Sequence, residues 1–177
     1  MDGFPLPFFY DYPPYYTLQP VKESRDKQSQ LWGDLVLAYC RHKRIYAINV
    51  EDSAFELFSN AKIGRKLNVE AQRAFLGDLA AQGSAEWVDP KAKRECLVLW
   101  RKLPEWAAQI HEFARTYGLA DSVMTVDELR SGDDVRGTEL FGLHREVLVR
   151  ALRVLEAQGK AKLFSGETPE EEGVKFL

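Results

Sequence analysis

The chain has 177 residues, of which 45% are hydrophobic and 29% charged, and its formal net charge is −3. This composition is typical of a globular protein that buries a core, and it excludes the disordered and fibrous classes. No uncharged apolar stretch approaches the roughly 18 to 20 residues of a spanning helix, and the first residues do not resemble a signal peptide, so we expect a cytosolic protein.

The negative charge is concentrated in the second half of the chain. Residues 1–102 carry 15 Lys and Arg against 13 Asp and Glu, a net charge of +2. Residues 103–177 carry 9 against 14, a net charge of −5. The second half is therefore expected to repel phosphate backbones and to attract basic partners.

Residues 1–20 differ from the rest, because they hold five of the eight prolines and seven of the 21 aromatic residues. Proline fixes φ and removes an amide donor, so we expect an extended arm and no helix. Two similar units occur in it, Leu6–Phe9 and Pro13–Tyr16. One hypothesis is that their aromatic side chains enter pockets on a partner; the alternatives are a tail that covers its own domain and a ligand for a WW domain. The aromatic residues concerned are Phe8, Phe9, Tyr15 and Tyr16.

The next 80 residues have the element order of a winged helix. Apolar residues at helical spacing predict a helix over residues 24–43, followed by a short strand at 45–48 and a helical turn at 52–58. Asn68 is a good N-cap for a helix that Gly83 would end. Two apolar runs, 85–88 and 96–100, then read as a hairpin with a basic tip.

The remaining residues repeat this order. We predict a helix from Pro104 to Gly118, a short strand at 123–125, a helix that begins at the capping box Thr125–Glu128, and a helix over 144–158. A final hairpin, 161–164 and 174–177, surrounds an acidic loop.

A direct repeat at an offset of 76 residues supports two copies of one domain. Residues 76–85 match residues 152–161 at two leucines, an Ala-Gln-Gly triplet and a final alanine. The match spans a helix end, its glycine and the next strand. We therefore predict an α+β chain with two tandem winged-helix domains, 21–102 and 103–177, behind an extended proline/aromatic arm, 1–20.

No catalytic or metal-binding pattern is present. The sequence contains no Gly-x-Gly-x-x-Gly, no Walker-type loop, no His-Glu-x-x-His and no Gly-x-Ser-x-Gly. The three histidines and the acidic loops are interpreted as structural or solvated, and Cys40 and Cys96 as buried reduced thiols. We expect a protein that is not an enzyme and that needs no cofactor and no metal.

DNA binding is the main alternative that a winged helix raises. The helix over 68–82 offers only Arg73 against two acidic residues, and the second wing is acidic. We therefore expect no direct contact with nucleic acid, although the basic first wing keeps open a transcription-associated protein that binds DNA or polymerase factors.

The arm, the tryptophan in the first helix and the two winged helices together resemble the small subunits of the ESCRT-II endosomal sorting complex. The specific part is the arm, with Leu6–Phe9 and residues 12–20, followed by Trp32. The resemblance covers the whole chain. It implies that two copies join two larger subunits, with docking through arm residues; Leu6 stands where a full Pro-Pro-x-aromatic motif has its first proline. The residues carried over are Pro7, Phe8, Phe9, Pro13, Pro14, Tyr15 and Tyr16.

The same resemblance implies a second partner, an ESCRT-III subunit whose N-terminal helix binds the second domain. The net charge of −5 suits a basic helix, and four apolar residues outside the predicted helical faces are candidates for its groove, with core packing as the alternative: Val123, Met124, Phe141 and Leu143. The implied role is sorting of ubiquitinated cargo into multivesicular bodies, without catalysis. The implied location is the cytoplasm, with indirect recruitment to endosomal membranes; a nuclear pool and self-association of the isolated chain stay open.

Overall fold

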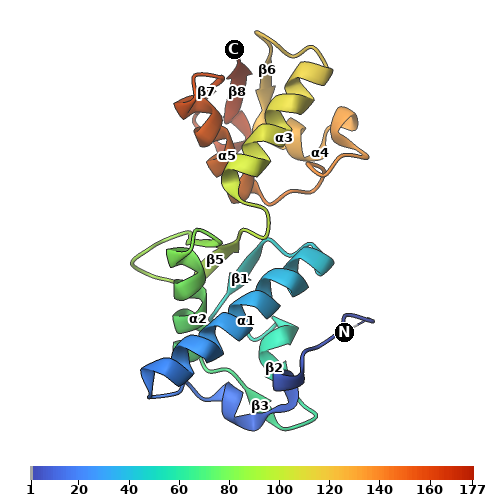
Figure 1. The fold of residues 1–177 in the computed structure, drawn as a ribbon. Helices are drawn as coiled ribbons and strands as arrows, with labels where there is room; N and C mark the ends of the chain where they lie inside the picture. The colour runs from blue at the N-terminus through green and yellow to red at the C-terminus, as the bar shows by residue number, and fades with distance from the viewer. Residues whose placement is uncertain (1) are drawn as a thin grey trace. The chain divides into compact units, whose positions relative to one another are not determined.

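The computed structural model describes residues 2–177, and the chain forms two compact units. The first unit ends at Trp100, and the second runs from Arg101 to Leu177 (Figure 1). Residues 2–20 belong to the first unit and do not form a separate part of the chain.

The first unit is built from two long helices and a three-stranded antiparallel sheet with the order β1-β5-β4. Its main elements are α1 (Lys22–Lys43), β1 (Ala47–Asn49), α2 (Val69–Ala81), β4 (Ala85–Trp87) and β5 (Glu95–Val98). The helical turn expected at 52–58 is reduced to a 3₁₀ helix, η3 (Glu56–Phe58). A small hairpin of β2 (Ser59–Asn60) and β3 (Arg65–Lys66) follows it. The sequence did not predict this hairpin, because strands of two residues carry no alternating pattern.

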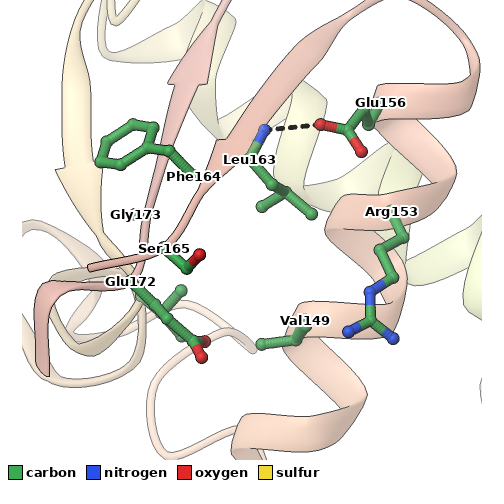
Figure 2. A pocket seen from close by; sticks show the side chains of 9 residues that line it. Val149, Arg153, Glu156, Leu163, Phe164, Ser165, Glu172 and Gly173 are labelled. Atoms are coloured by element: carbon green, nitrogen blue, oxygen red, sulfur yellow. Dashed lines mark hydrogen bonds between the residues drawn. The ribbon is translucent and has the colours of Figure 1, made fainter. Parts of the chain in front are cut away.

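The second unit repeats this arrangement, with the sheet order β6-β8-β7. Its elements are α3 (Leu103–Thr116), β6 (Val123–Thr125), α4 (Val126–Ser131), η4 (Asp133–Val135), α5 (Arg145–Ala157), β7 (Ala161–Phe164), η5 (Pro169–Glu171) and β8 (Gly173–Phe176). The hydroxyl of Thr125 accepts a hydrogen bond from the amide of Glu128 at 3.0 Å, so the predicted cap begins α4. The backbone amide of Leu163 on β7 donates a hydrogen bond to the carboxylate of Glu156 on α5, with 2.8 Å between the nitrogen and the oxygen (Figure 2).

The sequence repeat corresponds to the same helix-to-strand turn in both units. The helices α2 and α5 end at Ala-Gln, and the glycine that follows has a positive φ, 78° at Gly83 and 74° at Gly159. In each copy the amide after the glycine donates to the carbonyl five residues earlier at 2.9 Å, from Ser84 to Leu79 and from Lys160 to Leu155. Glycine adopts this left-handed conformation more readily than other residues, which explains why a glycine follows both helices.

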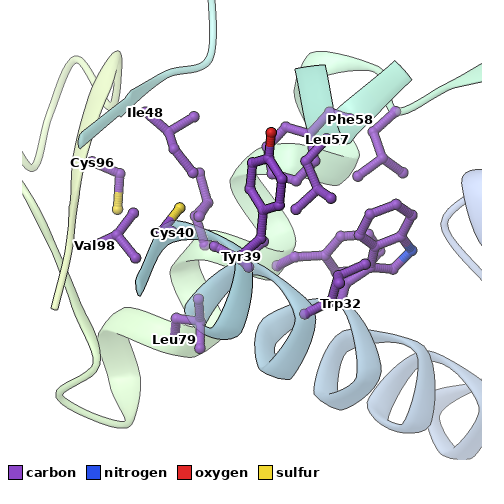
Figure 3. Close-up of a cluster of buried hydrophobic side chains, with 14 of the residues drawn as sticks. Trp32, Tyr39, Cys40, Ile48, Leu57, Phe58, Leu79, Cys96 and Val98 are labelled. Atoms are coloured by element: carbon purple, nitrogen blue, oxygen red, sulfur yellow. The ribbon is translucent and has the colours of Figure 1, made fainter. Parts of the chain in front are cut away.

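The core of the first unit is formed by α1, α2, the sheet and the N-terminal segment, and part of it is drawn in Figure 3. Trp32, Tyr39 and Cys40 of α1 are almost completely buried. Cys40 faces Cys96 of β5, and both thiols are free. Burial raises the pKa of both thiols, that of Cys96 to about 12, so both stay protonated at neutral pH. The prediction that both cysteines are buried is confirmed.

Within residues 2–177, no helix is long and apolar enough to cross a membrane. The same residues contain no group of three or more His, Cys, Asp or Glu side chains arranged to hold a metal ion.

Candidate functional site

The N-terminal segment, residues 2–20, is folded onto the first unit, although we expected it to be extended. Its two units each form a 3₁₀ helix, η1 (Phe8–Asp11) and η2 (Pro13–Tyr16). The prolines do not prevent this, because they lie at the cap or the first positions of each turn, where no amide donor is needed. The amides that the turns do need are supplied by other residues, such as Tyr10, which donates to the carbonyl of Pro7, and Tyr15, which donates to that of Tyr12.

In each predicted docking unit, the second of the two aromatic residues, Phe9 or Tyr16, is part of the first unit's core. Phe9 and Tyr16 are 5% and 4% exposed, and their rings lie 5.2 Å from the ring of Trp32 in edge-on contacts. Tyr10 is buried beside them, 6.1 Å from the same indole. Phe9 and Tyr16 are therefore structural in this conformation, which corrects the expectation that they are exposed anchors.

Backbone carbonyls of η2 accept hydrogen bonds from α1. The indole N–H of Trp32 donates to the carbonyl of Tyr15 at 2.8 Å. The side-chain amide of Gln28 donates to the carbonyls of Tyr15 and Thr17 at 3.0 and 2.8 Å. Its carbonyl oxygen accepts the backbone amide of Gln19 at 3.1 Å. These bonds attach the end of the segment to the helix.

The middle of the segment, at Tyr10 and Asp11 of η1, is attached to the β2–β3 hairpin. The side-chain amide of Asn60 donates to the carbonyl of Tyr10 at 2.8 Å and to the carboxylate of Asp11 at 2.9 Å. The ammonium of Lys62 and this amide hold the pKa of Asp11 below its usual value. Burial raises the pKa of Tyr10, so its hydroxyl stays protonated and donates to the carbonyl of Leu57 at 2.9 Å.

The aromatic side chains left at the surface are Phe8 and Tyr12. Phe8 is 88% exposed, and its ring stacks on that of Tyr12, 6.3 Å away and 47% exposed. Leu6 is also exposed. Of the other predicted residues, Pro14 is exposed and Pro7, Pro13 and Tyr15 are half-buried. The sequence analysis missed Tyr12, because this residue lies between the two predicted units and belongs to neither.

The four apolar candidates of the second unit do not share one environment. Val123 on β6 and Phe141 in the loop before α5 are exposed, and Met124 is half-buried. Leu143 is completely buried, because the turn before α5 points its side chain into the core. It cannot contact a partner in this fold, and the alternative of core packing holds for it.

Two grooves lie elsewhere on the second unit. One, of about 260 Å³, lies between α5 and the final hairpin, where Val149, Arg153 and Phe164 line it (Figure 2). The other, of about 420 Å³, lies along α3 and is more apolar, with Phe113 and Tyr117 in its lining. Neither of these two grooves includes a predicted partner-binding residue.

Two of the three arginines of α5, the helix that would read DNA in a winged helix, form ion pairs within the second unit. Arg145 forms ion pairs with Asp127 at 2.8 Å and with Glu172 at 2.9 Å. Arg150 pairs with Glu146 at 2.8 Å. These pairs, beside an acidic wing, disfavour recognition of a phosphate backbone.

Comparison with known proteins identifies the family. A family model described as ESCRT-II complex subunit matches residues 9–144. The chain belongs to this family. It is 51% identical over 173 residues to vacuolar protein sorting-associated protein 25 of Arabidopsis thaliana, a match that covers 98% of this chain and 96% of the relative. The Homo sapiens protein of that name is 38% identical over 176 residues, covering 99% and 98%. The resemblance inferred from the sequence is confirmed.

Solved structures give the same answer for the fold of this ESCRT-II subunit. The crystal structure of subunit VPS25 of the endosomal trafficking complex ESCRT-II matches with a TM-score of 0.84 and 25% identity, covering 96% of this chain and 98% of that one. The crystal structure of the endosomal complex ESCRT-II (VPS22/VPS25/VPS36) matches with a TM-score of 0.79 and 24% identity, covering 96% and 98%. The predicted α+β class with two tandem winged-helix domains is confirmed, and the chain is a component of the vacuolar and endosomal protein-sorting machinery.

Proposed function

We propose that this chain is a non-enzymatic subunit that holds ESCRT-II together through the exposed side of its N-terminal segment. The observation that carries the proposal is Phe8, an aromatic side chain that is 88% exposed on a backbone bonded to the first unit. An exposed aromatic side chain costs little entropy to immobilise when its backbone is already fixed, and buried aromatics dominate the energetics of protein interfaces.

The partners in this proposal are the two larger ESCRT-II subunits. A solved relative of this fold forms a complex described as VPS22/VPS25/VPS36, which supports equivalent partners here. The contact surface consists of Phe8 and Tyr12 as anchors, with Pro14 and the half-buried residues Pro7, Pro13 and Tyr15 around them. The complex, and not this chain alone, reaches the endosomal membrane.

A double variant tests this assignment. We expect Phe8→Ala with Tyr12→Ala to weaken binding to the larger subunits by at least roughly 30-fold, because one interface hot spot contributes about 2 kcal/mol. Since both side chains are largely exposed, the melting temperature of the free chain should stay within a few degrees of the wild type. Co-expression with affinity capture, followed by titration calorimetry, measures the loss.

The control for this experiment is Phe164→Ala, which removes from the second unit an aromatic side chain about as exposed as Tyr12, 42% against 47%. This variant should assemble as the wild type does. Undiminished assembly of the Phe8/Tyr12 variant would refute the proposal, and nucleic acid retained by the wild-type chain would favour the transcription-associated alternative.

The second unit, in this proposal, recruits the N-terminal helix of an ESCRT-III subunit and so links cargo sorting to membrane remodelling. Two observations support it: the net charge of −5 on residues 103–177, and the exposed apolar side chains of Val123 and Phe141, 59% and 48% exposed. An acidic surface with exposed apolar residues suits an amphipathic basic helix. Met124, the remaining candidate, is half-buried and follows Val123 on β6, where successive side chains point to opposite faces, so it is not part of the proposed contact.

Replacing Val123 with aspartate is expected to weaken binding of this helix by about tenfold or more, because the contact would then bury an unpaired carboxylate. Fluorescence anisotropy with a labelled helix peptide measures it. Tyr117→Asp, in the groove along α3, is the matched control and should bind normally. If Tyr117→Asp abolishes binding and Val123→Asp does not, the groove along α3 is the binding site and our assignment is wrong.

A further inference from the structure

Two buried polar side chains of the first unit form hydrogen bonds with the N-terminal segment. Among the described residues, the buried polar side chains are Gln28, Ser29 and Asn60, with 0%, 5% and 6% exposure. The side chain of Gln28 makes three hydrogen bonds, all with residues 15–19. Asn60 donates two hydrogen bonds to the segment, to the carbonyl of Tyr10 and the carboxylate of Asp11, and its side-chain oxygen accepts one from the amide of Lys62. A buried amide is costly unless its hydrogen bonds are made, so both side chains are stable only with the segment in place.

The two amides hold the backbone on either side of Tyr12, one residue of the exposed aromatic pair. Asn60 binds the carbonyl of Tyr10, two residues before Tyr12, and Gln28 binds the carbonyl of Tyr15, three residues after it. Tyr12 in turn stacks on Phe8. The position of the pair is therefore determined by hydrogen bonds to two different elements, α1 and the β2–β3 hairpin.

We propose that Gln28 and Asn60 are positioning residues that preorganise the N-terminal segment for binding the larger ESCRT-II subunits. This inference rests on the proposed function of Phe8 and Tyr12. A free peptide of the same sequence would have to order its backbone on binding, whereas the segment bonded to Gln28 and Asn60 has already done so. Neither residue touches the partner; each acts through the carbonyls it holds.

The variant Gln28→Glu tests the inference with little change in volume. The carboxylate cannot donate to the carbonyls of Tyr15 and Thr17, so η2 should detach, and we expect about tenfold weaker binding to the larger subunits at pH 7.5. Gln30→Glu makes the same change at an exposed position of the same helix and should have no effect.

A pH series distinguishes a positioning role of Gln28 from a general loss of stability in the variant. Burial raises the pKa of a carboxyl group, and the protonated form can again donate one hydrogen bond to a carbonyl. Relative to the wild type at each pH, Gln28→Glu should therefore recover part of its affinity as the pH falls toward about 5. Hydrogen exchange should be faster at the amides of Tyr15 and Thr17 and unchanged along α2.

The outcomes distinguish the two proposals. If Phe8→Ala with Tyr12→Ala leaves binding intact, the proposed function itself fails. If that variant loses binding while Gln28→Glu binds normally despite faster exchange in η2, the positioning role is overturned. If Gln28→Glu accelerates exchange throughout the first unit, the variant Asn60→Ala takes its place, and its binding to the larger subunits and its hydrogen exchange are measured in the same way. Normal binding by Asn60→Ala together with faster exchange in η1 alone would overturn the inference.

Discussion

Trp32→Ala is expected to lower the free energy of unfolding of the first unit by about 3–5 kcal/mol, the usual cost of removing a buried aromatic side chain. Trp32 is completely buried on α1, and the ring of Phe75 stacks on its indole 6.2 Å away. Phe58 lies edge-on at 5.9 Å. Phe9, Tyr10 and Tyr16 of the N-terminal segment complete the shell. Alanine would leave a cavity that rings from three parts of the chain cannot fill together.

The two units are best followed separately, because unfolding of a two-unit chain need not be a single transition. Hydrogen exchange with denaturant titration, read by peptides from residues 22–43 and 145–157, measures each unit. Trp32→Phe keeps much of the ring packing and loses the hydrogen bond to the carbonyl of Tyr15, so it should cost less than alanine. A loss below about 1 kcal/mol in Trp32→Ala would show that the aromatic cluster is not the centre of the first unit's core.

Periodic patterns in the sequence predicted the long elements well. The spacing of apolar residues in α1, α2, α3 and α5 placed each helix to within a few residues, because one buried face fixes a period of 3.6. The Ala-Gln-Gly triplet placed the two helix ends, because a left-handed residue is required after each helix. These features depend on local sequence, so local sequence predicts them.

Short elements could not be predicted in the same way, and neither could the question of which of two neighbouring side chains is buried. Whether Phe8 or Phe9 is buried depends on where η1 meets α1, which is a tertiary contact and not a local preference. Leu143 looked available because it lies outside every helical face, yet its turn directs it into the core. The proline-rich composition argued for an extended segment, but two turns of four residues need only a few amide donors.

Deleting residues 1–20 is expected to destabilise the first unit and not merely to remove a tail. The deletion takes away three aromatic side chains that are at most 5% exposed, Phe9, Tyr10 and Tyr16, each of which contributes roughly 1.5–3 kcal/mol through burial. Since a domain's whole stability is about 5–15 kcal/mol, most of the first unit's margin would be lost. The deletion would also remove the acceptors in the segment to which Gln28 and Asn60 donate.

Circular dichroism melting and hydrogen exchange of the deleted chain measure this effect, and the second unit serves as the internal reference. We expect exchange in α1 and α2 to approach that of an unfolded chain while α5 stays protected. Loss of assembly by this chain would then report unfolding as much as lost contacts, so only the Phe8 and Tyr12 variant isolates the docking surface. Full protection of α1 after the deletion would mean that residues 22–100 fold by themselves, and residues 1–20 would then be a docking element that the first unit's stability does not need.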